Sequence, residues 1–386
     1  MLRKGLLVIR LRLLRSVVMV GALAATAVVG VSVTAAAAPV KAARTAKAAS
    51  STKSSKATTV TKARKAPRAS KAVSSVRATQ RRARVSAGRR RISLARAREQ
   101  REAQQPRFKL DEAGDLIPDV RAEAAIVYDP LTGRVLYEEN SQLPRSIASI
   151  TKVMTAAVFL EDNPDLSQQV MVASADVRGA SVTHLRAYER VSLQNLLHLL
   201  LIASDNAAAR TLARVSPYGA SGFVVRMNQK AEELGLQSTR YADSSGLVAE
   251  NVSSAYDMAR LISYAAQDEL ISTIMRTEEF SFRTSRRALT IRSTNQLLRS
   301  PGIDVRGGKT GFITRSGYCL ATLLRLPDLN QTLAVVVLGA KSNAGRFWET
   351  RHLLTWISSK ASGLVLPGRQ GQQAPEPHQT PQTPHH

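Results

Sequence analysis

Two side chains that are able to perform nucleophilic chemistry lie three residues apart in this sequence. Ser149 supplies a hydroxyl and Lys152 an amine, and the apolar residues around them recur at helical spacing. Positions three apart on a helix share one face, so we expect the hydroxyl and the amine to touch. A serine becomes a strong nucleophile when a neighbouring base takes its proton, and a desolvated, neutral lysine is able to act as that base.

Two further short motifs follow in the chain. Ser204-Asp205-Asn206 comes directly after a leucine-rich helical pattern, and Lys309-Thr310-Gly311 begins a strand-like run. Short polar side chains at a junction between helices are able to point into a cleft. A lysine on a strand supplies a cation for the same site.

Each of the first two motifs also occurs elsewhere in the chain. Residues 50–53 repeat Ser-x-x-Lys in a segment without apolar periodicity, and residues 293–295 repeat Ser-x-Asn without a preceding buried helix. Neither repeat has the predicted structural context. The order and surroundings of the motifs therefore decide which copies are functional.

Ser-x-x-Lys, Ser-x-Asn and Lys-Thr-Gly, in this order, are the signature of the penicillin-binding proteins and serine β-lactamases. The chain resembles the low-molecular-mass D-alanyl-D-alanine peptidases among them, in particular the endopeptidase type, over roughly residues 117 to 360. The resemblance implies an α/β (α+β) fold of the β-lactamase/DD-peptidase kind. In it a central antiparallel sheet is flanked by helices, and the active site lies between the sheet and a mainly helical subdomain.

The resemblance also implies catalytic roles. Ser149 is the nucleophile and Lys152 is its base. Ser204 relays a proton to the leaving amine, and Asn206 anchors Lys152 and the substrate amide. Asp205 fits the motif and is expected to be structural.

Substrate binding is assigned in the same way to the third motif. Lys309 and Thr310 hold the terminal carboxylate of the substrate, and Gly311 allows the substrate to approach the strand closely. The backbone N–H groups of Ser149 and Phe312 form the oxyanion hole. No metal or other cofactor is implied.

The implied reaction is cleavage of peptidoglycan stem peptides through an acyl-enzyme, with β-lactams as covalent inhibitors. A D-Ala to diaminopimelate crosslink and a D-Ala-D-Ala terminus both present a carboxylate beyond the scissile bond, so the motifs do not separate endopeptidase from carboxypeptidase. The chain ends soon after a closing helix, without the extra β-domain and terminal anchor of many carboxypeptidases. This favours a D-alanyl-D-alanine endopeptidase.

Two other functions remain as alternatives. A serine β-lactamase needs a second base, usually in a Glu-x-x-Leu-Asn loop, and the nearest match begins at Glu233 on a helical pattern where the side chain is expected to be solvated. A polyanion-binding or wall-binding protein with an inactive peptidase domain is the other. The complete set of three motifs argues against it.

The net charge of +26 is concentrated at the front of the chain. Residues 1–107 hold 26 lysines and arginines and two acids, whereas the remaining chain is nearly neutral. Residues 39–107 form a basic Ala/Lys/Arg-rich arm whose composition predicts disorder. It is either a linker or an attachment to an anionic wall polymer or membrane surface; no nucleic acid partner is expected for an exported protein.

Residues 1–38 combine basic residues with a short apolar run and small residues, which is typical of a signal peptide or an uncleaved anchor. We expect a periplasmic or exported protein, associated with the inner membrane if the anchor is retained. The catalytic domain is predicted over 108–365. Residues 366–386 form a Gln/Pro/His tail predicted to be disordered.

Local patterns give further expectations. Residues 125–137 predict a hairpin, Ser192 is expected to cap a helix, and three strand-like runs after residue 304 are expected to pair antiparallel. A closing helix over 346–358 is expected to pack Phe347, Leu354 and Ile357 on the sheet. His198 is interpreted as a packed or surface histidine, and Cys319 as a small buried residue.

Overall fold

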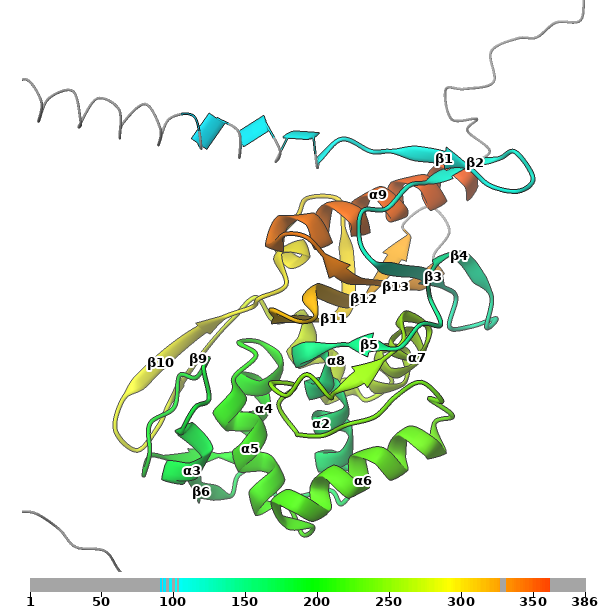
Figure 1. Ribbon diagram of the computed structural model, residues 1–386. Helices are drawn as coiled ribbons and strands as arrows, with labels where there is room; N and C mark the ends of the chain where they lie inside the picture. The colour runs from blue at the N-terminus through cyan, green and yellow to red at the C-terminus, as the bar shows by residue number, and fades with distance from the viewer. Residues whose placement is uncertain are drawn as a thin grey trace, which may run out of the picture. The chain divides into compact units, whose positions relative to one another are not determined.

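Three consecutive ten-residue strands form one side of the main sheet in a computed structural model, which describes residues 104–326 and 331–361 and single positions between 91 and 102. The strands are β11 (Asp304–Ile313), β12 (Gly317–Leu326) and β13 (Gln331–Ala340). The predicted hairpin adds β3 (Ala124–Tyr128) and β4 (Val135–Glu139). All neighbours pair antiparallel in the order β11-β12-β13-β3-β4 (Figure 1).

Alternate side chains of the sheet enter two different apolar cores. On β13, Val336 and Leu338 pack into the core shared with the helical part, whereas Val335 and Val337 pack into the core under α9 (Asn343–Ala361). The closing helix is therefore present and longer than predicted. Its buried face is also rotated slightly: Phe347 and Ile357 are buried as expected, but Leu354 is only partly buried. Leu353 and Trp356 fill the core instead.

The helical part is built around the helix that follows Ser149. This helix, α2, packs against four of the other helices, α4, α5, α6 and α7, and most of its residues are buried. The helices of this part are α2 (Thr151–Leu160), α3 (Ser174–Val177), α4 (Leu193–Leu201), α5 (Asn206–Val215), α6 (Gly219–Glu233), α7 (Ala255–Ala265) and α8 (Glu269–Arg276). As predicted, Ser192 caps α4 by accepting a hydrogen bond from the Asn195 N–H.

Short elements complete the described part. They are β1 (Phe108–Leu110), β2 (Leu116–Pro118), β5 (Arg145–Ser146), η1 (Ala148–Ile150), β6 (Gln169–Met171), β7 (Arg190–Ser192), β8 (Val252–Ser253), β9 (Glu279–Arg283), β10 (Ala288–Arg292) and η2 (Gln296–Arg299). Strands β9 and β10 form a separate hairpin that projects from the sheet beside the helical part (Figure 1).

The arrangement confirms the predicted fold: an antiparallel sheet flanked by helices, with a mainly helical subdomain. The first strand begins at Phe108, where the catalytic domain was predicted to start. The predicted signal segment, nearly all of the basic arm and the C-terminal tail lie outside the described residues. No helix in the described ranges has both the length and the apolar content needed to cross a bilayer.

Candidate active site

A strained turn presents Ser149 at the entrance to α2. The residue before it, Ala148, has a positive φ of 48°, a left-handed conformation that costs a non-glycine residue about 1 kcal/mol or more. Ser149 lies in the 3-10 turn η1, and the α-helix begins two residues later at Thr151, whose hydroxyl donates to the Ala148 carbonyl over 2.8 Å. The serine is half-buried, and Lys152 is fully buried one turn further on.

The amine of Lys152 contacts three oxygen atoms. Its Nζ lies 2.8 Å from Ser149 Oγ and 2.6 Å from Asn206 Oδ1, and it is also hydrogen-bonded to the Ser245 carbonyl. The Asn206 amide donates from Nδ2 to the Ala180 carbonyl over 2.6 Å, which turns Oδ1 toward the amine. Asn206 Oδ1 and the Ser245 carbonyl only accept hydrogen bonds. A neutral amine therefore donates its two N–H groups to them, and its lone pair faces the Ser149 hydroxyl.

Burial makes this neutral form accessible near physiological pH. Desolvation is the largest influence and lowers the pKa of Lys152 to about 7, with the positive charge of Arg210 adding in the same direction. The carboxylates of Asp243 and Asp205 oppose it. An amine with a pKa near 7 is matched to accepting and returning a proton at neutral pH.

Ser204 is held in a second left-handed conformation, with a φ of 59°. Its hydroxyl accepts a hydrogen bond from Lys309 Nζ over 2.7 Å, and the same amine donates to the Thr310 carbonyl over 2.8 Å. Burial, followed by the charges of Lys152 and Arg346, lowers the pKa of Lys309 well below its usual range.

The sheet contributes its edge strand β11 to the site. A Cβ atom at Gly311 would lie 2.6 Å from the Ile147 carbonyl oxygen and 3.1 Å from the Ser149 nitrogen, so only glycine permits this close approach. The next residue, Phe312, is 49% exposed, and its ring stacks on Tyr318 at a centroid distance of 4.2 Å.

A cleft of about 530 Å³ separates these elements. Ser149, Ser204 and Asn206 form what we call its helical wall, with Lys152 directly behind them. Residues 309–312 form its strand wall, on which Thr310, Gly311 and Phe312 face the cleft. The structure thus brings all the predicted site residues to one place. In the described part of the chain, no carboxylate lines this cleft.

Several residues of the cleft region lie outside the predicted set, and four of them contact Lys152, the nucleophile turn or the strand wall. Two of them, Ser245 and Gly246, belong to one turn. The Ser245 carbonyl accepts a hydrogen bond from Lys152, and a Cβ at Gly246 would meet the Ala148 carbonyl oxygen at 2.0 Å. The remaining two are Thr294 and Arg346.

The turn carries a local signal in its composition, Asp-Ser-Ser-Gly, which is typical of tight turns. Asp243 shapes the turn by accepting hydrogen bonds from the Ser245 hydroxyl and the Gly246 N–H. What the pattern lacks is any sign of the partner, Lys152, which lies 93 residues away.

Thr294 and Arg346 reach the cleft from distant parts of the chain. The Thr294 hydroxyl lies 2.6 Å from that of Thr310, and Arg346 donates to the carbonyls of Gly311 and Cys319 over 2.9 and 3.0 Å. Thr294 comes from the Ser-x-Asn repeat that sequence context set aside. Arg346 lies on α9, within a segment read only as packing.

Other sequence interpretations hold at the level of contacts. Asp205 is the N-cap of α5 and accepts from the Ala208 N–H over 2.9 Å. Glu233 forms ion pairs with Arg226 and Lys230 at the surface, and these lower its pKa to about 2. His198 stacks on Phe280 and Cys319 is buried without a disulfide partner.

Comparisons with known proteins agree with this geometry. The family model for D-alanyl-D-alanine carboxypeptidases matches residues 111–342. A D-alanyl-D-alanine endopeptidase of Pseudomonas aeruginosa is 35% identical over 246 residues, covering 62% of this chain and 78% of the relative. The corresponding enzyme of Escherichia coli is 32% identical over 255 residues, covering 65% and 80%.

Among solved structures, the Streptomyces K15 DD-transpeptidase superposes with a TM-score of 0.59 at 27% identity. The match covers 62% of this chain and 97% of the Streptomyces chain. The resemblance inferred from the three motifs is thereby confirmed. This chain belongs to the D-alanyl-D-alanine carboxypeptidase family and is a serine D-Ala-D-Ala peptidase of the penicillin-binding class.

Proposed function

We propose that this chain is a serine D-alanyl-D-alanine endopeptidase, which hydrolyses D-Ala to diaminopimelate crosslinks of peptidoglycan through an acyl-enzyme on Ser149. The observation that carries the proposal is the 2.8 Å contact between Ser149 Oγ and the buried amine of Lys152. That contact pairs a nucleophile with a base at hydrogen-bond distance, as proton transfer requires.

In the acylation step, Lys152 Nζ accepts the Ser149 proton while Oγ attacks the D-alanyl carbonyl carbon. The backbone N–H groups of Ser149 and Phe312 stabilise the oxyanion, which is typically worth about 3 to 4 kcal/mol for each donor. The C–N bond then breaks, and the proton held by Lys152 passes through the hydroxyl of Ser204 to the leaving amine, which leaves Lys152 neutral again. Lys309, bonded to that hydroxyl, supports the transfer.

Hydrolysis of the acyl-enzyme repeats the chemistry with water. Lys152 takes a proton from the attacking water and returns one to Ser149 Oγ as the ester bond breaks. The donor stem leaves as a carboxylic acid. Since no carboxylate lines the described cleft, a second base of the β-lactamase kind has no candidate there, and slow release of a penicilloyl group is expected.

The strand wall provides substrate binding. An extended stem peptide adds to the free edge of β11 through backbone hydrogen bonds. Lys309 and Thr310 bind the carboxylate that lies one residue beyond the scissile bond. Arg346, held on the Gly311 carbonyl, supports the positive potential at this end.

Endopeptidase activity is favoured over carboxypeptidase activity by the two relatives, both named endopeptidases, that the chain matches over most of their lengths. Carboxypeptidase activity is the second candidate, because the family model carries that description. Both reactions use the same acyl-enzyme and the same residues, Lys309 and Thr310, to bind the substrate carboxylate.

The proposal also includes the inhibitors, the domain boundaries and the location expected from the sequence. β-Lactams acylate Ser149, and the catalytic domain at 108–365 works in the periplasm or outside the inner membrane. Residues 1–38 direct export, and the basic arm over 39–107 binds an anionic wall polymer or membrane surface or serves as a linker, while 366–386 form a tail. The strong positive charge of the first 107 residues supports the attachment role.

The test is digestion of purified crosslinked muropeptide dimers, followed by mass spectrometry of the products. The endopeptidase converts dimers to monomers with the mass gain of one water, and Ser149→Ala does not. Removal of terminal D-Ala from pentapeptides without cleavage of dimers would show that the chain is a carboxypeptidase and not an endopeptidase. Rapid, repeated turnover of penicillin contradicts both.

A further inference from the structure

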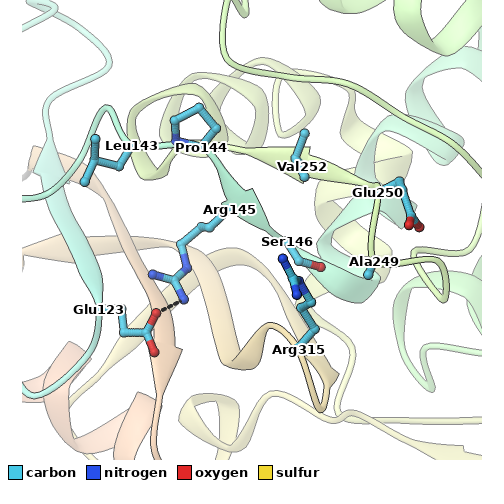
Figure 2. A pocket seen from close by; sticks show the side chains of 9 residues that line it. All are labelled: Glu123, Leu143, Pro144, Arg145, Ser146, Ala249, Glu250, Val252 and Arg315. Atoms are coloured by element: carbon cyan, nitrogen blue, oxygen red, sulfur yellow. Dashed lines mark hydrogen bonds and ion pairs between the residues drawn. The ribbon is translucent and has the colours of Figure 1, made fainter.

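A second pocket, of about 740 Å³, is lined by residues that are close in sequence to those of the catalytic cleft. Figure 2 shows its lining. Its lining includes charged residues of both signs, Glu123, Arg145, Glu250 and Arg315, together with Ser146. Strands β5 and β8 pair beneath it, with Ser146 opposite Val252. None of these residues belongs to the three catalytic motifs.

The pocket and the cleft are lined by neighbouring residues of the same three chain segments. The segments 146–149, 246–250 and 310–315 each contribute residues to both cavities. Along β11 and the turn that follows it, the carboxylate-binding residues Lys309 and Thr310 come first. Gly311 and Phe312 come next, and Arg315 follows in the turn. The second pocket therefore lies past the scissile position, on the side away from Lys309 and Thr310, where the donor stem peptide must run.

The charges of this pocket are not all neutralised internally. Arg145 forms an ion pair with Glu123. Arg315 and Glu250, in contrast, form no ion pair or side-chain hydrogen bond with any described residue, and both are exposed. In Figure 2 the two arginines lie between the two glutamates. The pocket therefore offers one unpaired cation and one unpaired anion.

A buried hydroxyl without a partner lies in the same pocket. Ser146 is only 7% exposed, and its Oγ makes no hydrogen bond in the described part of the chain; Arg145 Nε is also buried without a partner. A buried polar group left unpaired is unfavourable, so a ligand that supplies a hydrogen-bond partner is favoured here. The Ser146 hydroxyl, beside the unpaired guanidinium of Arg315, is suited to binding a carboxylate.

We propose that this pocket binds the zwitterionic end of a diaminopimelyl side chain, the third residue of the donor stem. Arg315 and Ser146 receive its carboxylate, and Glu250 receives its ammonium. This inference rests on the proposed function, because it places the donor stem along β11. Four carbon–carbon bonds separate the two amino-acid centres of diaminopimelate, a span of about 5 Å, so a residue adjoining the scissile D-Ala reaches past Phe312 toward Arg315.

The test compares two synthetic crosslinked dimers that differ only in the donor third residue. One carries meso-diaminopimelate, and the other carries L-lysine, which keeps the ammonium and lacks the carboxylate. The full chain should cleave the first with kcat/KM about three- to tenfold higher, the range expected for a partly exposed charge-assisted contact. Arg315→Ala should abolish this preference and leave the lysine dimer within about twofold of its original rate. Glu250→Gln should lower kcat/KM for cleavage of both dimers.

The matched control is Arg134→Ala, which removes an exposed arginine from the turn between β3 and β4. It should leave the preference intact. An unchanged preference in Arg315→Ala, or an equal loss on both dimers, overturns the assignment. Acylation of Ser149 by a fluorescent penicillin reports on folding and on the catalytic motifs, and it should proceed at the original rate in all three variants.

Failure of the proposed function has a different signature. A chain that penicillin acylates but that cleaves neither dimer contradicts endopeptidase activity. In that case the pocket is tested directly by using NMR to monitor binding of the tripeptide L-Ala-D-γ-Glu-meso-diaminopimelate. Saturable shifts at residues 146, 250 and 315 that disappear in Arg315→Ala support it, and their absence overturns it.

Discussion

The helical wall of the cleft contributes buried side chains, whereas the strand wall contributes one buried amine and an exposed backbone edge. On the helical wall, Lys152 is fixed by three oxygen contacts, and Asn206 is itself held by the Ala180 carbonyl. On the strand wall, Gly311 has no side chain and Phe312 is half-exposed. The first wall is organised to move a proton, and the second is organised to receive a peptide.

The difference teaches where each kind of substitution should act. Removing a group from the helical wall should slow the chemical step, because proton transfer depends on one short contact. Removing a hydroxyl from the strand wall should weaken binding with a smaller effect on the chemistry. Residues 243–246, which form a turn against both the nucleophile turn and Lys152, should affect folding as well.

The largest effect is expected for Lys152→Ala. Loss of the base should slow acylation of Ser149 by a fluorescent penicillin by about 10³-fold, within the usual range for general-base catalysis. Stopped-flow or gel-based labelling measures the rate. Circular dichroism should be recorded to check that the variant is folded, because alanine leaves Asn206 Oδ1 and the Ser245 carbonyl without this donor. Acylation at the original rate would show that Lys152 is not the base. The helical wall would then contribute no more to the chemical step than the strand wall does.

The next effect concerns the turn that abuts the helical wall. Gly246→Ala should reduce the free energy of unfolding by about 3 kcal/mol, since the added Cβ would meet the Ala148 carbonyl oxygen at 2.0 Å. Gly114→Ala is the matched control: its φ of +82° is similar to the +74° of Gly246, but its surroundings are open. That variant should lose only about 1 kcal/mol, from backbone strain. Denaturant unfolding distinguishes the two, and equal losses would exclude the steric cause.

A third effect is the dependence of acylation on pH. Lys152 acts as a base only when neutral, and its pKa is lowered to about 7. The acylation rate should therefore fall about tenfold for each pH unit below 7 and level off above it. The folded pKa lies below the unfolded value of about 10.4, so the folded state binds fewer protons between these values and its stability should rise with pH across that window. A rate that declines from pH 6 to 8 would contradict this assignment.

The smallest effect is expected at Thr294, which contacts the strand wall. Thr294→Val removes the hydroxyl that contacts Thr310 and should raise KM for a stem peptide about threefold with kcat nearly unchanged. Thr290→Val is the control, because Thr290 pairs with the Ser281 hydroxyl on the exposed β9-β10 hairpin. A loss in kcat equal to that in KM would place Thr294 in the chemical step instead.

Much of the helical wall was predictable, because its key contacts are local. The three-residue spacing of Ser149 and Lys152 on an apolar-striped helix is enough to predict that the two side chains meet. The Ser192 cap and the leucine-rich helix that leads to Ser204 were readable from the same kind of pattern. The sheet order was also accessible, since consecutive apolar runs joined by short turns pair antiparallel.

The rest depends on contacts between distant segments. Nothing in the sequence near Ser245 indicates that its carbonyl faces Lys152, and nothing near Thr294 indicates that it reaches Thr310. Arg346 was hidden because a helix that packs on a sheet is also able to donate hydrogen bonds to the carbonyls of that sheet. Periodicity reports which face of an element is buried, but not which partner meets it.

The central claim is that the buried amine of Lys152 is neutral near physiological pH and faces the Ser149 hydroxyl. An NMR titration of the lysine amines, with the Lys152 signal assigned through Lys152→Ala, measures this directly. We predict a midpoint near pH 7 for Lys152. A midpoint near the ordinary lysine value of about 10.4 would contradict the claim.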